Sequence, residues 1–330
     1  MQSIKPNLQN KLINSYKHMI TIHHLDNRAI ILQKTGLMHT YPCAHGHEAI
    51  ATAVAEHLNM DDVFVPYYRD HGVLLARNAT PIDILNYWSG KRHLPKTGEN
   101  DLPLCIPIAT QCSHAAGVAY AMKLKNKNTI ALCSLGDGAT SKGDFYEAIN
   151  FASIHNLPVV YLISNNQWAI STPIKLQSAA NNLTDIADAL NCKNYVVDGT
   201  NIFATTTVLS EAIQYCRTYS VPVVIEATTY RLGNHTTVDD ATRYMPKDEL
   251  EQARQNCPIK NLHKYLIDKK LITQTQVEKI NAEIITYIDK CADAAVNTKP
   301  NNFNSIFDNV YAEMPNCLKE QKHQLEKLYE

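Results

Sequence analysis

Two oxygen-bearing side chains each follow an apolar run of the sequence. Asp137 stands between two glycines just after residues 129–135, and Asn166 follows residues 158–164. Short runs rich in branched residues predict buried strands, and the ends of parallel strands meet at one edge of a sheet. Open parallel sheets bind their ligands at that edge. A carboxylate and an amide oxygen placed there are suited to hold a hard cation such as Mg²⁺ against a phosphate.

The turn around Asp137 has the residues that a phosphate site needs. Gly136 and Gly138 carry no Cβ, so the backbone can turn sharply and approach a ligand closely. From Gly143 onward the apolar residues recur at helical spacing, so a helix is predicted to begin just after the turn, with its N-terminal amides facing the ligand. A Gly-Asp-Gly turn that merely caps a helix would look the same, so the flanking residues decide between the two.

Residues 136–152, followed by residues 165–173, resemble the thiamine diphosphate motif of the 2-oxo acid dehydrogenases, and most closely the alpha subunit of their first component. The resemblance covers most of the chain. It implies that thiamine diphosphate and Mg²⁺ are the cofactors. The residues that it places against them in this segment are Gly136, Asp137, Gly138, Ala139, Asn166 and Trp168. Of these, Asp137, Asn166 and the backbone carbonyl of Trp168 would hold the Mg²⁺.

Residues 64–72 carry the same resemblance. Tyr68 and Arg69 stand where members of the family bind the diphosphate. A planar guanidinium matches a phosphate group through paired hydrogen bonds.

Residues 105–111 resemble the segment that bends the cofactor, and Ile106 and Ile108 take the positions that contact it. Thr110 and Gln111 match a loop that holds a potassium ion in branched-chain relatives. Cys105 stands where a serine would be expected, so the potassium ion is left open.

Residues 229–244 resemble the phosphorylation-loop region of the family. His235 falls on its active-site histidine, and this position distinguishes it among the 14 histidines of the chain. An imidazole that titrates near neutral pH can exchange protons or stabilise developing charge on a 2-oxo acid intermediate. The resemblance therefore makes His235 the candidate catalytic residue and a cofactor contact. Thr236 stands where some members carry a phosphorylated serine.

Residues 39–49 resemble the entry to the first core helix. Animal members of the family place a cofactor-site histidine near His39. Tyr41 fits the longer loop of bacterial and branched-chain members, where it would line the substrate channel.

The resemblance also implies partners. Thiamine enzymes need a glutamate against the pyrimidine ring, and in this family it belongs to a separate beta subunit. A chain of 330 residues has room for one diphosphate-binding domain but hardly for both halves of the site. We therefore expect a heterotetramer of two alpha and two beta subunits, which passes the acyl group to the lipoyl group of an acyltransferase.

The substrate is less sharply indicated. Residues 171–180, 239–244 and 312–316 look most like bacterial pyruvate dehydrogenase, whereas residues 109–111 lean towards the branched-chain 2-oxo acid enzymes. Acetoin dehydrogenase is a third member of the same group. A non-catalytic nucleotide-binding protein is an alternative from another class, although its Gly-x-Gly-x-x-Gly fingerprint would need the third glycine two positions before Gly143.

The composition favours a protein with a substantial core. Hydrophobic residues make up 45% of the chain and the formal net charge is -1, which argues against nucleic-acid partners and disorder. Nine cysteines without a Cys-x-x-Cys pair indicate reduced thiols rather than disulfides or zinc. The sequence has neither an apolar signal region nor a run long enough to span a membrane, so we expect a cytoplasmic protein without a membrane partner.

The elements that must position these residues form a doubly wound α/β fold, a mostly parallel sheet flanked by helices. We expect an N-terminal helical segment over 1–35, a thiamine diphosphate domain over 36–245 and a C-terminal helical arm over 246–330. Strands are predicted over 129–135, 158–164, 195–197 and 221–227. Helices are predicted over 48–58, 80–88, 115–122, 186–190, 208–215, 247–253, 262–267 and 274–291.

Overall fold

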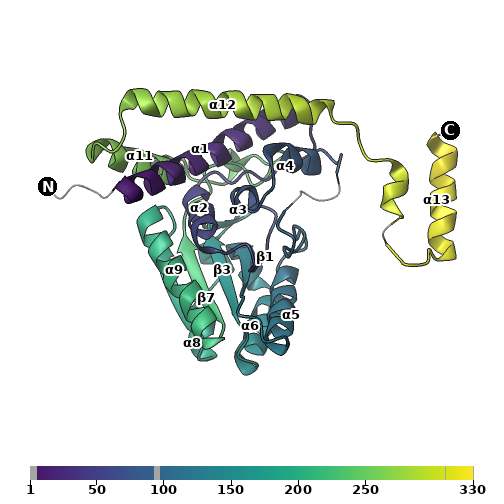
Figure 1. Cartoon of the computed structure of the whole chain (residues 1–330), viewed down its shortest axis with the longest axis horizontal. Coiled ribbons are helices and arrows are strands. Elements are labelled where there is room, and N and C mark those ends of the chain that lie inside the picture. The colour runs from purple at the N-terminus through teal and green to yellow at the C-terminus, as the bar shows by residue number, and fades with distance from the viewer. Residues whose placement is uncertain (1–5, 93–96, 309, 330) are drawn as a thin grey trace.

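The computed structural model describes residues 6–92, 97–308 and 310–329. A five-stranded sheet in the order β1-β2-β3-β7-β6 lies at its centre, and every pair of neighbouring strands is parallel (Figure 1). Its strands are β1 Val63–Val65, β2 Ala131–Gly136, β3 Val159–Asn165, β6 Lys193–Asp198 and β7 Val223–Thr228. The predicted parallel sheet is confirmed, and four of its strands lie where the sequence placed them.

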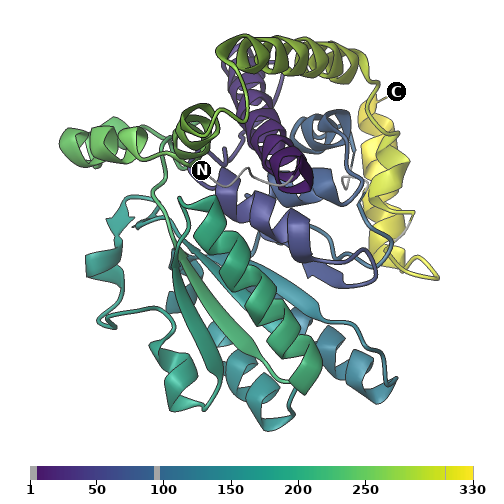
Figure 2. The same cartoon turned by 60° about the vertical axis from the view of Figure 1, so that its left-hand side comes forward.

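Helices cover both faces of the sheet, because successive side chains of each strand point to opposite faces. In β2, Leu132 belongs to one buried core, whereas Ala131 and Cys133 belong to the other. Figures 1 and 2 show α9 on the first face and α5 and α6 on the second. The bounds of these helices are α5 Thr110–Leu124, α6 Gly143–Ile154 and α9 Ile202–Tyr219. The fold is therefore doubly wound, as expected.

Two long helices near the ends of the chain pack on the same side as α9. The long helix α1, Pro6–Lys34, lies along α12, Gln274–Asn297 (Figure 1). Met19 of α1 and Ile288 of α12 belong to the core that also contains Leu132. The predicted C-terminal arm thus contributes to the main core as far as the end of α12.

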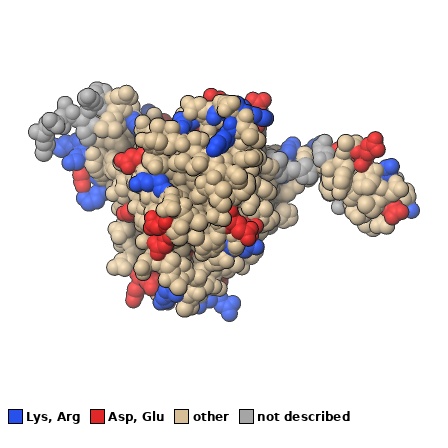
Figure 3. Space-filling view, turned by 90° about the horizontal axis from the view of Figure 1, so that it is seen from below, with Lys and Arg blue, Asp and Glu red and all other residues tan. Residues whose placement is uncertain are grey.

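Beyond α12 the chain leaves the main body. A 3-10 turn, Phe303–Ile306, and helix α13, Asn316–Tyr329, stand apart from it in Figures 1 and 3. The other helices are α2 Glu48–His57, α3 His71–Ala76, α4 Pro81–Trp88, α7 Ile174–Gln177, α8 Asp185–Ala189, α10 Lys247–Gln255 and α11 Pro258–Asp268, with 3-10 turns at Asp137–Ser141 and Ala241–Arg243.

Two helices, α5 and α9, begin five and six residues earlier than predicted. Asn201 accepts hydrogen bonds from the amides of Phe203 and Ala204, so α9 begins at this cap rather than at residue 208. Helix α5 begins at Thr110, directly after Ala109, whose φ is 65°. The sharp turn at Ala109 separates α5 from the segment 105–108, which lies at the sheet edge.

The surface gives further information. In the part of the chain that the structure describes, helices are all too short or too polar to cross a membrane. On the face drawn in Figure 3, acidic and basic side chains are intermingled over the main body.

Candidate active site

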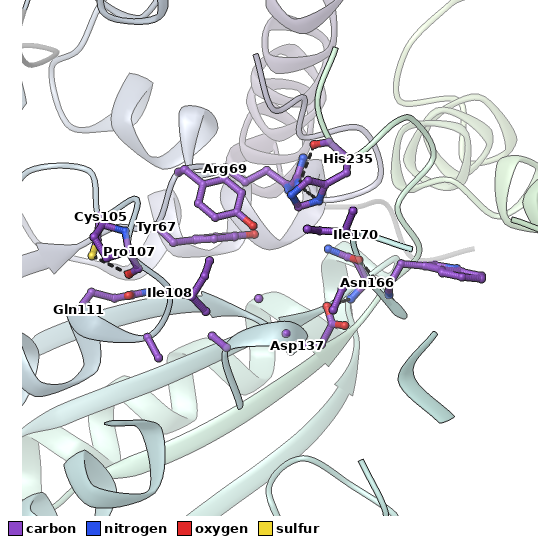
Figure 4. A pocket seen from close by; sticks show the side chains of 17 residues that line it. Tyr67, Arg69, Cys105, Pro107, Ile108, Gln111, Asp137, Asn166, Ile170 and His235 are labelled. Atoms are coloured by element: carbon purple, nitrogen blue, oxygen red, sulfur yellow. Dashed lines mark hydrogen bonds between the residues drawn. The ribbon is translucent and has the colours of Figure 1, made fainter. Parts of the chain in front are cut away.

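The ends of four strands meet at one edge of the sheet. β1 leads into Tyr68 and Arg69, β2 into Asp137, β3 into Asn166 and β7 into the loop that carries His235. Cross-strand pairing of residue 136 with 164, and of residue 165 with 228, keeps these ends level. They line an open cavity of about 190 Å³ (Figure 4).

The cavity collects nearly all of the predicted site residues. Those that line it are Tyr68, Arg69, Ile108, Gly136, Asp137, Gly138, Ala139, Asn166, Trp168 and His235. Ile106, which was expected to contact the cofactor, is 48% exposed and does not line the cavity.

Asp137 presents a buried carboxylate to this cavity. One oxygen, Oδ1, accepts a hydrogen bond from the amide of Asn166 at 3.3 Å, and the other, Oδ2, has no partner among the described residues. Burial raises the pKa of the Asp137 carboxyl to about 6. A buried carboxylate oxygen without a donor is unfavourable, so the geometry favours a cation beside it.

Asn166 and Trp168 follow in a tight turn. The Oδ1 atom of Asn166 accepts a hydrogen bond from the amide of Trp168 at 3.2 Å. Between them Gln167 has a φ of 73°, which reverses the chain so that both residues line the cavity. The three predicted Mg²⁺ ligands are therefore grouped at the ends of β2 and β3, with a carboxylate oxygen, an amide oxygen and a carbonyl oxygen.

Arg69 supplies a positive charge to the same cavity. It is 3% exposed, and its Nη atoms donate to the carbonyls of Cys43 and His235. Its Nε atom has no partner among the described residues. The guanidinium lies 5.4 Å from the centre of the Tyr68 ring. A buried guanidinium with a free donor is suited to a phosphate group.

His235 differs from the expectation of near-neutral titration. Burial and the positive charges of Arg69 and Arg231 lower the pKa of its imidazole to about 3. Its Nδ1 lies 3.3 Å from Nη2 of Arg69, and its backbone amide donates to Asp239 at 2.7 Å. His235 is thus a neutral imidazole held by the loop. Since its Nδ1 faces the donor Arg69, its Nε2 carries the hydrogen and can donate a hydrogen bond.

Arg231 is a site residue that the sequence reasoning missed. It is fully buried and donates to the carbonyls of Trp168 at 3.1 Å and Ile170 at 2.7 Å, and to the hydroxyl of Tyr244 at 2.7 Å. The hydroxyl of Tyr244 in turn donates to Asp239. Arg231 therefore ties the turn that holds Trp168 to the loop that holds His235. It lies in residues 229–244, yet nothing in its type distinguished it from a surface arginine.

The segment 105–111 forms one wall. Ile108 lines the cavity and is 43% exposed, so it presents an apolar side chain to the opening. Gln111 is buried and donates from Nε2 to the carbonyl of Ser134 at 3.1 Å, while its Oε1 has no partner among the described residues. This free oxygen is compatible with the potassium ion that the resemblance left open.

Two residues of the segment 39–49 lie elsewhere than expected. Tyr41 is fully buried, and its hydroxyl donates to Asp26 at 2.7 Å and contacts Nδ1 of His71 at 2.9 Å. It fixes the fold of the loop and lines no channel. His39 is exposed and lies outside the cavity.

The cavity fits a diphosphate with a divalent cation. Oxygen ligands at the ends of β2 and β3 face a guanidinium at the end of β1. The space between them is narrow at Gly138, where an added Cβ would lie 3.0 Å from the Cβ of Ala169. A side chain there would crowd the neighbouring turn.

Comparison with known proteins gives one family. The sequence model of the family "Dehydrogenase E1 component" matches residues 16–304. The chain is 35% identical to the pyruvate dehydrogenase E1 component subunit alpha of Mycoplasma pneumoniae, over 92% of this chain and 86% of that protein. It is 36% identical to the 3-methyl-2-oxobutanoate dehydrogenase subunit alpha of Mycobacterium tuberculosis, over 94% of this chain and 85% of that protein. The 2-oxoisovalerate dehydrogenase subunit alpha of Bacillus subtilis is 30% identical, over 91% of this chain and 95% of that protein.

Proposed function

The chain belongs to the dehydrogenase E1 component family, as the alpha subunit of a 2-oxo acid dehydrogenase, and we propose that its substrate is pyruvate. This family membership sets aside the non-catalytic nucleotide-binding alternative. The observation that carries the proposed cofactor site is that the partnerless Asp137 carboxylate oxygen and the buried Arg69 guanidinium lie in one cavity. That pairing is the charge pattern of a metal-bound diphosphate.

The family implies thiamine diphosphate, and we propose Mg²⁺ as its metal. When bound, thiamine diphosphate supplies the carbon nucleophile and the electron sink for decarboxylation. Asp137, Asn166 and the carbonyl of Trp168 would hold the metal, and the second lone pair of that carbonyl stays available beside its bond to Arg231. Arg69 would pair with the diphosphate.

The remaining contacts orient and shield the site. Tyr68 would join Arg69 at the diphosphate, and residues 136–139 would lie against it. Ile108 would press on the cofactor and exclude water. His235, held neutral at physiological pH with its Nδ1 facing Arg69, would donate a hydrogen bond to the substrate from Nε2. Ile106, whose side chain is exposed and does not line the cavity, is given no cofactor contact in this proposal.

A beta subunit completes the site in this proposal. None of the residues that line the cavity, in the part of the chain that the structure describes, is a glutamate. The helices beside it, α5 and α6, expose large apolar side chains: Tyr120, Leu124, Phe151 and Ile154 are 37%, 67%, 41% and 65% exposed. We propose that the beta subunit covers this surface, supplies the glutamate and forms a heterotetramer of two alpha and two beta subunits.

Further expectations rest on the same proposal. The acyl group would pass to a lipoyl group of an acyltransferase. Residues 36–245 would be the cofactor-binding unit between the helical segments 1–35 and 246–330. A cytoplasmic location is consistent with the nine cysteines, all of which are free.

The second candidate substrate is a branched-chain 2-oxo acid. Relatives named for either substrate are similarly identical, at 35% and 36%. Side-chain size is discriminated by few contacts, each worth about 1–3 kcal/mol. Acetoin stays a third candidate.

One assay tests the substrate. The chain would be co-produced with its beta subunit, and the release of carbon dioxide from pyruvate and from 3-methyl-2-oxobutanoate would be compared with and without thiamine diphosphate. We expect a higher kcat/KM for pyruvate. A preference for the branched substrate would contradict the choice of pyruvate while leaving the family intact.

A further inference from the structure

We infer that His47 is a positioning residue, which fixes the orientation of the Asn166 amide so that its oxygen is available to a metal beside Asp137. The inference rests on the proposed function, because it concerns the Mg²⁺ that Asp137 and Asn166 would hold. His47 itself does not line the cavity.

The hydrogen bonds around Asn166 define the orientation of its amide. The amide group of Trp168 lies 3.2 Å from one end of the Asn166 side chain, and a backbone N–H can only donate. That end is therefore the oxygen. The other end, which is an NH₂ group and a donor, lies 3.2 Å from Nε2 of His47. His47 must accept this hydrogen bond, so the pair has one chemically consistent arrangement.

The turn that carries His47 has little freedom. Gly46 has a φ of 96°, and a Cβ there would lie 2.1 Å from the carbonyl oxygen of Tyr230. The carbonyl of Gly46 accepts from the hydroxyl of Thr229, and the amide of His47 donates to the carbonyl of Ala44 at 2.8 Å. Since the backbone is fixed on both sides of it, the imidazole has a fixed direction.

The burial of both partners makes the contact consequential. His47 and Asn166 are each 4% exposed, so no solvent replaces the acceptor if the imidazole is removed. The NH₂ group of Asn166 would then lack a partner, and a shift of the side chain towards another acceptor would relieve it. Such a shift would displace the oxygen from its place beside Asp137, whose Oδ2 has no partner among the described residues. His47 thus acts on the metal through Asn166.

Three substitutions of His47 in the alpha–beta complex test this role. His47→Phe keeps a ring without an acceptor, His47→Leu removes both, and His47→Gln restores an acceptor oxygen. His57→Leu is the matched control, because His57 ends the same helix, α2, and does not line the cavity. Mg²⁺ would be titrated at a fixed concentration of thiamine diphosphate while the fluorescence of Trp168, which lines the cavity, is followed. Binding would be confirmed by calorimetry.

We expect His47→Phe and His47→Leu to raise the Mg²⁺ concentration at half-saturation about 10- to 100-fold. This is the range typical of losing a residue that hydrogen-bonds a metal ligand. His47→Gln should stay within about 3-fold of the wild type, and His57→Leu should match it. If Phe and Leu variants that fold bind Mg²⁺ like the wild type, or if His47→Gln loses as much as they do, the inference is overturned. A wild-type complex that shows no Mg²⁺-dependent binding of thiamine diphosphate contradicts the proposed function itself.

Discussion

At the residue scale, Asp137 is a carboxylate in a place that disfavours its charge. Its Oδ2 is buried without a partner, and burial raises its pKa to about 6. In the proposed function, a cation compensates this charge. The sequence indicated Asp137 through its glycine turn. It could not indicate Arg231 or His47, since their partners, Trp168 and Asn166, are far away in the chain.

Asp137→Asn should stabilise the cofactor-free chain. Because the folded pKa is raised, the folded chain binds more protons than the unfolded chain, and stability falls as the pH rises from about 4 to 6. At pH 7.5 the substitution removes that cost, on the order of 3 kcal/mol at most. Thermal melts should show a higher Tm without cofactor and no further rise when Mg²⁺ and thiamine diphosphate are added. A lower Tm at pH 7.5 would show that the charge is already compensated.

His235 predicts a pH dependence of opposite sign. Its folded pKa, about 3, lies below the unfolded value, so the unfolded chain takes up a proton that the folded chain refuses as the pH falls from 6.5. This proton uptake lowers the stability of the folded chain by about 2 kcal/mol at pH 5. His235→Gln should therefore lose less stability than the wild type between pH 7 and pH 5 in urea unfolding. Equal losses would mean that His235 is protonated in the folded chain.

At the element scale, strand ends and turns bring the site together. The sequence predicted β2, β3, β6 and β7 because their apolar runs are long and bounded by turn residues. It missed β1, which has only three residues, and the pair β4 and β5, Trp168–Ala169 and Thr172–Pro173, because runs this short show no period. The start of α9 was hidden by threonines, which are weak helix formers.

Two glycines give a matched test of the turns. At Gly46 a Cβ would lie 2.1 Å from a backbone oxygen and φ is 96°, so Gly46→Ala should destabilise the chain by roughly 2 kcal/mol or more. At Gly117, inside α5, a Cβ would meet nothing within 4 Å, so Gly117→Ala should stabilise it by about 0.4–1 kcal/mol. Both are measured by thermal or urea unfolding of the purified chain. Similar effects of the two changes would contradict the packing described around Gly46.

The exposed face of α5 and α6 predicts where the beta subunit binds. Phe151→Asp combined with Ile154→Asp should reduce co-purification of the beta subunit while the Tm of the alpha chain changes little, since both side chains are exposed. Tyr219→Asp is the control, because Tyr219 is 63% exposed at the end of α9, on the other face of the sheet. If the control disrupts the complex and the double variant does not, the partner binds elsewhere.

At the scale of the whole molecule, one core joins the sheet to α1 and α12, and the cavity opens at the edge of that sheet. The family match ends at residue 304, and the tail that carries α13 lies beyond it. The overall fold could be predicted because alternating strand and helix patterns admit few topologies. The position of the tail away from the core could not be predicted, because its amphipathic pattern resembles that of any helix packed on a core.

The most direct measurement of the central claim is the binding of thiamine diphosphate by the alpha–beta complex, together with the decarboxylation of pyruvate. The wild-type complex should bind the cofactor in a Mg²⁺-dependent manner and release carbon dioxide only in its presence. With Asp137→Ala, both binding and release should be lost while the complex stays assembled. Carbon dioxide release without thiamine diphosphate, or full activity with Asp137→Ala, would contradict the account.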